Sequence, residues 1–153
     1  EVSVEKKWND ENNNDGIQPT EVTVQLFAGD KAVGTPVKLN KENNWKHVFS
    51  NLKAKAEGKD IEYTVKEVDV PEGYTVTVEG KNNIVITNTH VPALTELSVI
   101  KLWEDENNKD SSRPASITVQ LFANDKPQGD VVVLNEENSW KHTFANLKAK
   151  VNG

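Results

Sequence analysis

The sequence repeats itself at a fixed spacing. Shifting the 153-residue chain by 95 positions aligns residues 1–58 with residues 96–153, and 35 of these 58 pairs are identical without a gap. Such self-similarity indicates a tandem repeat of one structural unit. We therefore predict a first unit over residues 1–90, a linker over 91–95 and a second unit over 96–153. Because Gly153 aligns with Gly58, this second copy is expected to be truncated, with only its N-terminal part present.

Within the first unit, short runs of β-branched and aromatic residues alternate with turn-forming clusters. Stretches rich in Gly, Pro, Asn, Asp or Lys separate the runs, and no segment is long enough for a stable amphipathic helix. Seven short strands in about 90 residues are typical of an all-β, immunoglobulin-like sandwich. The expected strands cover residues 2–8, 20–28, 32–39, 45–52, 61–69, 74–79 and 83–89.

The composition excludes several classes of function. The net charge is −6 and no cluster of Lys and Arg is present, whereas nucleic-acid binding needs a basic surface. The absence of cysteine excludes disulfides and Cys-ligated metals. No apolar run approaches the ~18 residues of a membrane-spanning helix. We expect no nucleic-acid partner, no cofactor and no membrane insertion in this fragment.

Three of the expected strands each place one polar residue on an otherwise apolar face. Side chains alternate between the two faces of a strand, so Lys6 shares a face with Val4 and Trp8. By the same parity, Glu67 and Asn88 join the apolar faces of their own strands. Lys7 is a rival for the role of Lys6, but its parity directs it outward. Because burying an unpaired ammonium is costly, Lys6 needs a partner or must lose its charge.

One reaction open to this trio is condensation of Lys6 Nζ with the side-chain amide of Asn88, which releases ammonia and leaves an isopeptide bond. Burial lowers the pKa of a lysine and raises that of a glutamate, so a neutral amine beside a protonated Glu67 is chemically reasonable. Glu67 then acts as the catalytic acid that hydrogen-bonds the carbonyl and relays protons to ammonia. The alternatives are a buried Lys6–Glu67 ion pair and an Asn88 that caps a turn.

Several motifs also resemble the B-type repeat of Gram-positive collagen adhesins. They are Val-x-Lys-x-Trp with a following Asn/Asp-rich loop and Pro, then Tyr-Thr-Val-x-Glu, Pro-Glu-Gly-Tyr and Ile-Thr-Asn-Thr. The resemblance covers the first unit and as much of the second as is present. It implies an inverse immunoglobulin-like Greek-key β-sandwich and an autocatalytic Lys–Asn isopeptide bond promoted by an acid. Carried over by position, these residues are Lys6, Asn88 and Glu67, whereas Lys101, the repeat equivalent of Lys6, is left unpaired.

Two other motifs are weaker. Residues 11–16 look like a calcium loop, but Val22 stands where the distal glutamate is required and Ser111 replaces the glycine in the second copy. We therefore predict a solvated turn. His47 and His142 have no second His or Cys at ligand spacing, so they are expected to be ordinary strand residues and no metal site is predicted.

These features favour a structural role. The resemblance implies a stalk or spacer repeat of an adhesin on the bacterial cell surface, extracellular and anchored to the wall through regions outside this sequence, with neighbouring repeats as partners. The alternative is a binding module that presents loops 9–19 or 53–60, or aromatic residues such as Trp8 and Trp45, to an unidentified host ligand. No Ser-His-Asp or paired-carboxylate arrangement is recognisable, so we expect no enzyme that acts on external substrates.

Overall fold

The computed structural model describes residues 1–153 and contains strands and turns but no helix. The chain divides into two compact units. The first unit comprises Glu1–Ala93 together with Lys150–Gly153, and the second comprises Leu94–Ala149. No helix is therefore long and apolar enough to cross a membrane. The all-β fold expected from the sequence is confirmed.

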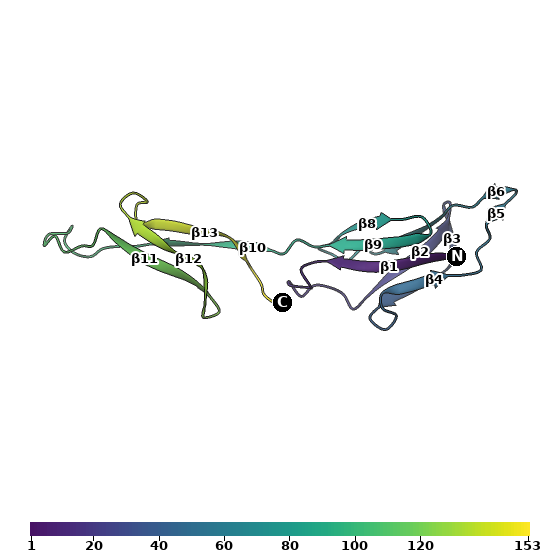
Figure 1. Ribbon diagram of the computed structural model, residues 1–153, viewed down its shortest axis with the longest axis horizontal. Helices are drawn as coiled ribbons and strands as arrows, with labels where there is room; N and C mark the ends of the chain where they lie inside the picture. Colours follow the sequence, from purple (N-terminus) through teal and green to yellow (C-terminus); the bar gives the residue numbers. More distant parts are fainter. The chain divides into compact units, whose positions relative to one another are not determined.

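The first unit contains nine strands, most of them in two sheets (Figure 1). One sheet has the order β4-β1-β9-β8 and the other has the order β3-β2-β7, while β5 and β6 form a short hairpin of their own. This two-sheet arrangement is the predicted immunoglobulin-like sandwich. The strands are β1 (Val2–Asn9), β2 (Glu21–Ala28), β3 (Lys31–Asn40), β4 (Lys46–Phe49), β5 (Lys55–Ala56), β6 (Lys59–Asp60), β7 (Tyr63–Val68), β8 (Thr75–Glu79) and β9 (Asn83–Thr89).

The core of the first unit is formed by alternate residues of strands in both sheets. Along β1, for example, Val2, Val4 and Lys6 are buried while the residues between them are partly exposed. This alternation is the period of two that the sequence predicted. The buried apolar cluster consists of Val2, Val4, Val22, Val24, Leu26, Leu39, Val65, Ile84 and Ile86.

The first and last strands of this unit are neighbours. β1 and β9 run parallel, with Lys6 opposite Ile86 and Trp8 opposite Asn88. The other pairs of this sheet, β1 with β4 and β8 with β9, are antiparallel. Residues near the two ends of the unit are therefore brought together at the centre of one sheet.

The region around β4 departs most from the strands expected from the sequence. The strand expected over residues 45–52 is reduced to β4, because Trp45 and Asn51, one near each end of the expected strand, have φ values of 60° and 58°, which a strand cannot accommodate. The loop expected after it contains the β5–β6 hairpin instead. Its two turn residues, Glu57 and Gly58, have positive φ, as a tight two-residue hairpin turn requires.

The second unit contains four strands, which pair as two separate ribbons, β10 with β13 and β11 with β12. By the shift of 95 residues they correspond to the first four strands of the first unit. β10 begins inside the expected linker, so Leu94 and Thr95 belong to a strand. The strands are β10 (Leu94–Ile100), β11 (Ser116–Ala123), β12 (Lys126–Asn135) and β13 (Lys141–Lys148).

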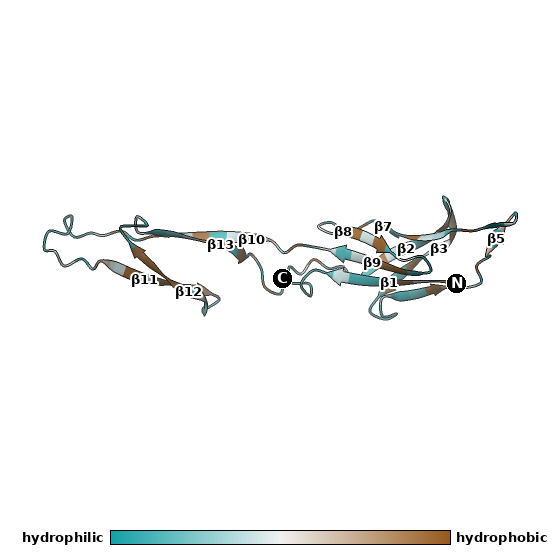
Figure 2. Cartoon of the chain, turned by 45° about the horizontal axis from the view of Figure 1, so that its top comes forward, coloured by the Kyte–Doolittle hydropathy of each residue, from teal (hydrophilic) through white to brown (hydrophobic).

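Little apolar surface is buried in the second unit. Only Leu121 and Leu134 are buried apolar residues there, and apolar stretches, brown in Figure 2, run along β11 and β12. Because a two-stranded ribbon cannot cover its own face, these side chains remain accessible to solvent. The large apolar residues that are exposed between positions 94 and 149 are Leu94, Leu97, Ile100, Leu102, Phe122, Val131 and Val133.

Candidate functional site

Lys6, Glu67 and Asn88 come from three strands of the first unit. Lys6 lies on β1 and Asn88 on the neighbouring β9, whereas Glu67 lies on β7 in the other sheet, opposite Val24 of β2. Lys6 is 3% exposed and Asn88 is 0% exposed, and Glu67 is half-buried. The three side chains therefore meet across the space between the two sheets.

The closest contact within this group joins Glu67 to Asn88. Asn88 Nδ2 donates a hydrogen bond of 2.7 Å to Glu67 Oε1, while Asn88 Oδ1 and Glu67 Oε2 are buried without any hydrogen-bond partner. Burial raises the pKa of Glu67, although the hydrogen bond from Asn88 and the charge of Lys6 act in the opposite direction. Two acceptors that lack a donor make a proton on Glu67 favourable, because that proton turns one acceptor into a donor.

The Lys6 amine donates one hydrogen bond. Nζ donates to the backbone oxygen of Lys7 at 2.7 Å and lies 3.8 Å from the centre of the Trp8 ring. Burial lowers the pKa of Lys6 from 10.5 to about 8, and the charges of Glu67 and Asp10 oppose this shift. A much larger fraction of the amine is thus neutral near neutral pH than in an exposed lysine.

Sequence reasoning missed Asp10 and Tyr74, which lie beside this group. Asp10 is 3% exposed, and it accepts hydrogen bonds from Tyr74 Oη at 2.7 Å and from the Asn13 backbone amide at 2.9 Å. Burial, and then the hydrogen bond to Asp10, raise the pKa of Tyr74. Asp10 has the same parity as Lys6 and Trp8, so the alternation of β1 was a signal that could have identified it.

The prediction of a solvated turn over residues 11–16 is wrong for two of its members. Asn14 and Asp15 are 8% and 6% exposed. Asp15 Oδ2 lies 2.8 Å from His90 Nε2 and accepts a hydrogen bond of 2.9 Å from the Ala93 amide. The loop is thus tied to the segment that follows β9. No group of three or more His, Cys, Asp or Glu side chains is arranged to hold a metal ion.

Lys101 adopts a comparable position in the second unit. Its backbone amide donates to the Trp140 oxygen at 2.8 Å, as that of Lys6 does to Trp45, and its Nζ lies 4.6 Å from the centre of the Trp103 ring. The second unit has no counterpart of β7 or β9. No glutamate or asparagine equivalent to those of the first unit therefore accompanies Lys101.

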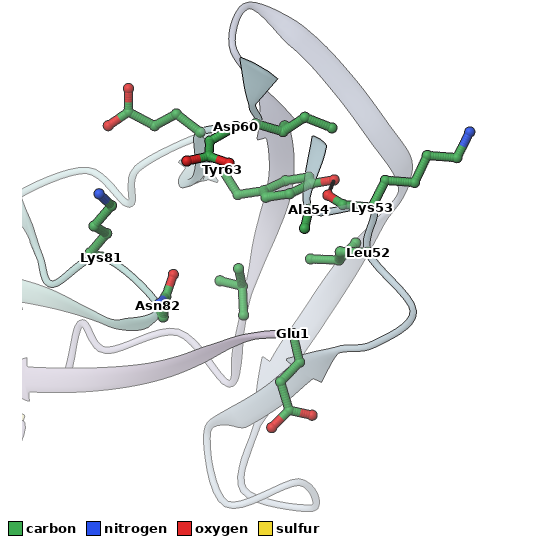
Figure 3. A pocket seen from close by; sticks show the side chains of 11 residues that line it. Glu1, Leu52, Lys53, Ala54, Asp60, Tyr63, Lys81 and Asn82 are labelled. Atoms are coloured by element: carbon green, nitrogen blue, oxygen red, sulfur yellow. Dashed lines mark hydrogen bonds between the residues drawn. The ribbon is translucent and has the colours of Figure 1, made fainter. Parts of the chain in front are cut away.

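A surface pocket of about 550 Å³ lies apart from the buried group. It includes both ends of loop 53–60, one of the loops proposed from the sequence for ligand binding, and it is not lined by Lys6, Glu67 or Asn88. Figure 3 shows that the Lys53 and Glu1 side chains extend away from the pocket, and Tyr63 Oη is already bonded to the Lys53 backbone oxygen at 2.8 Å. The charges of Lys53 and Glu1 therefore do not converge in the pocket.

Known proteins similar to this chain include a curated relative and two solved structures. The collagen adhesin of Staphylococcus aureus is 41% identical over 152 residues, which are 99% of this chain but only 12% of that protein. Two B repeat units of the collagen-binding protein of the same species match with a TM-score of 0.90 and 36% identity, over 98% of this chain and 40% of that chain. A single B repeat unit matches with a TM-score of 0.53 and 40% identity, over 99% and 79% of the two chains.

The family comparison covers both units. Residues 2–89 and 97–153 both match the same family of domains, in agreement with the internal repeat and with the sequence motifs of the first unit. The chain belongs to the Cna protein B-type domain family.

Proposed function

We propose that this chain is a spacer segment in the stalk of an extracellular bacterial surface adhesin, and that an isopeptide bond between Lys6 and Asn88 locks its first unit. Family membership and the similarity to a collagen adhesin support the stalk role. The main support for the covalent bond is that a lysine and an asparagine are both buried on adjacent strands and that Glu67 is hydrogen-bonded to the amide of the asparagine.

The reaction forms one bond and breaks another without a redox change. Neutral Lys6 Nζ attacks Asn88 Cγ, the Nζ–Cγ bond forms, the Cγ–Nδ2 bond breaks and one proton moves from Nζ to the departing nitrogen, which leaves as ammonia. Protonated Glu67 polarises the carbonyl and then carries the proton. Since both reactants are held on neighbouring strands, proximity replaces a bimolecular encounter. Each chain reacts once.

The position of the bond suits a spacer that bears tension. β1 and β9 run parallel, so force applied at the two ends of the first unit pulls them in opposite directions along their shared edge. A covalent link between these strands carries that load directly. Strands β2 to β8 then lie inside a closed loop and are not stretched.

Intact mass is the direct test. We expect the mass to be one ammonia below the value calculated from the sequence, and fragmentation to identify a peptide in which Lys6 is joined to Asn88. Lys6→Arg and Asn88→Ala should each retain the calculated mass. A wild-type chain of full mass, or a linkage to Lys101 in place of Lys6, would contradict the proposal.

Glu67→Gln tests the acid. Glutamine keeps the size and an acceptor oxygen but cannot supply the proton, so the variant should fold, retain the full calculated mass and melt at a lower temperature. The matched control is Glu62→Gln, because Glu62 is exposed and its substitution should leave the loss of ammonia unchanged. Ammonia loss in Glu67→Gln at the wild-type rate would show that the acid is dispensable.

The pH dependence of the rate reports both groups. The reactive state has a neutral Lys6 and a protonated Glu67. As the pH falls below the raised pKa of Glu67, the population of this state decreases because less of Lys6 is neutral. As the pH rises above the pKa of about 8 of Lys6, the population decreases because less of Glu67 is protonated. Ammonia loss after refolding should therefore be fastest between these two values. A rate that keeps rising well above pH 8 would remove Glu67 from the mechanism.

A further inference from the structure

The register of β1 and β9 does not place Lys6 directly beside Asn88. The residue opposite Lys6 is Ile86, and the residue opposite Asn88 is Trp8. Lys6 and Asn88 are thus offset by two residues, or about 6.6 Å along the strands at ~3.3 Å per residue. To reach the amide, the Lys6 side chain has to lean along β1 toward Trp8.

The Trp8 ring lies beside the Lys6 amine, where it can hold the side chain in this tilted orientation. Lys6 Nζ is 3.8 Å from the centre of the ring, within the range of a cation–π contact. Trp45 and Tyr74 pack edge-on against the same ring, with centroid distances of 5.4 and 5.2 Å. Because the hydroxyl of Tyr74 is itself held by Asp10, the ring has little freedom to move.

The same arrangement occurs in the second unit without the rest of the site. Lys101 Nζ lies 4.6 Å from the centre of the Trp103 ring, and Trp140 packs edge-on against that ring at 5.3 Å. No glutamate or asparagine counterpart is present there. The contact between lysine and tryptophan therefore forms without the acid and without the amide.

We propose that Trp8 is a positioning residue for the isopeptide reaction, which steers the Lys6 amine along β1 to the level of Asn88. This inference rests on the proposed function and adds a residue to it. The ring face holds the ammonium while the strands assemble, and proton transfer to Glu67 then releases a neutral amine beside the amide. The rate of bond formation thus depends on an aromatic ring at position 8, beyond the contribution of that ring to core packing.

The rate of ammonia loss after refolding tests this dependence. Trp8→Leu should slow the reaction at least about tenfold in folded protein, since small misplacements of a reacting group have effects of this size or larger. Trp8→Phe keeps a ring face and should restore most of the rate. Phe49→Leu is the control, because Phe49 packs against the same core but lies opposite Val2, four residues from Lys6 along β1, so the substitution should lower stability and leave the rate unchanged.

The outcomes separate this inference from the proposed function. Absence of ammonia loss in the wild type would overturn the proposed function itself. Ammonia loss in the wild type with an equal rate in folded Trp8→Leu would overturn only the positioning role. An equal slowing in Phe49→Leu would also overturn it, because the effect would then follow core packing alone.

A spectroscopic measurement remains decisive if Trp8→Leu does not fold. In Glu67→Gln, where Lys6 stays unbonded, the ε-methylene protons of Lys6 should show an upfield ring-current shift from Trp8. Lys101 in the wild type should show the same kind of shift from Trp103, and exposed Lys109 should show none. Unshifted ε-methylene protons of Lys6 in Glu67→Gln would overturn the inference.

Discussion

The two units share their first four strands but bury them differently. Val24 is 0% exposed, whereas its counterpart Val119 is only half-buried; Phe27 is half-buried, whereas Phe122 is 58% exposed. The local sequences are nearly identical, so composition does not explain the difference. In the first unit β2 also pairs with β7, and the second unit has no strand in that position.

Local features are nevertheless preserved in both copies. The β2–β3 ribbon shifts register between Val24 and Leu26, and the β11–β12 ribbon shifts at the equivalent place. At both shifts a glutamine, Gln25 or Gln120, donates hydrogen bonds to backbone oxygens of its own ribbon. Hairpin register and bulge are therefore determined by short-range sequence, whereas the core depends on strands that come much later in the chain.

Adding the strands that the second unit lacks should have the largest effect on its stability. A copy of residues 59–90 added after Gly153 provides counterparts of β7 to β9, which should cover the exposed apolar residues of the second unit. In the 153-residue chain, amides of β10 to β13 should exchange much faster than those of β1 and β9. In the extended chain they should be protected by roughly the 5–15 kcal/mol of a stable domain.

The extension also provides an acid and an asparagine for Lys101. We therefore expect a second ammonia to be lost, and the same extension with its asparagine counterpart changed to alanine should fold without that loss. Protection that stays unchanged on extension would contradict the view that missing strands cause the exposure. Folding without a second ammonia loss would limit the reaction to the first unit.

The same substitution made at equivalent positions of the two units should give the next largest effect, a difference in the unfolding free energy that is lost. Val24→Ala removes two buried methyl groups and leaves a cavity, so it should lower the unfolding free energy of the first unit by about 2 kcal/mol. Val119→Ala removes the same atoms from a half-buried position and should cost less than about 1 kcal/mol. Hydrogen exchange resolved by residue measures both changes, and equal costs would show that the second unit has a core of its own.

The inward faces of the site could be predicted from the sequence. Side-chain parity is a property of each strand by itself, so the positions of Lys6, Glu67 and Asn88 followed from the neighbouring apolar residues. The internal repeat likewise predicted the strands of the second unit. Whether the three residues react is not decided by parity and stays a prediction.

Features that depend on distant segments could not be predicted in this way. The two-residue offset between Lys6 and Asn88 depends on how β1 pairs with a strand about eighty residues later. The burial of Asp15 depends on His90, which lies beyond the last strand of the unit. An Asn- and Asp-rich run predicts a turn through local chemistry, but contacts made after folding decide whether that turn is solvated.

The Asp15–His90 contact predicts a pH response in the first unit only. His90 Nδ1 lies 2.7 Å from the Gly73 oxygen and Nε2 lies 2.8 Å from Asp15, so the doubly protonated ring satisfies both acceptors. The hydrogen bonds to Asp15 and Gly73 raise the pKa of His90, and the hydrogen bond from His90 is the main factor that lowers the pKa of Asp15. In the second unit Asp110 is exposed and no histidine corresponds to His90.

The direction of this pH dependence follows from the linkage between protonation and folding. The stabilisation from His90 is complete below its unfolded pKa of 6.5 and is lost as the pH rises through its raised value in the folded state. The stabilisation from Asp15 is present above 3.8 and is lost as the pH falls through its lowered value. Protection of the Ala93 amide should thus be greatest between pH 3.8 and 6.5, and His90→Gln should remove the decline on the alkaline side. A flat profile in the wild type would exclude the ionic contact.

The smallest expected effect concerns Arg113, which binds Asp105 in the second unit. Asp105 is the counterpart of Asp10, which Tyr74 binds in the first unit. Arg113 donates to both carboxylate oxygens of Asp105, at 2.6 and 2.9 Å. In the first unit Gln18 aligns with Arg113, and the hydroxyl of Tyr74 donates the hydrogen bond to Asp10 instead. Because the Asp105–Arg113 pair is partly solvated, Arg113→Gln should speed exchange of the Asn108 amide by only roughly two- to fivefold. Added salt should reduce the difference between variant and wild type, since it screens solvated charges. A much larger change that resists salt would mean that this ion pair, and not the ribbon backbone, holds the loop of the second unit in place.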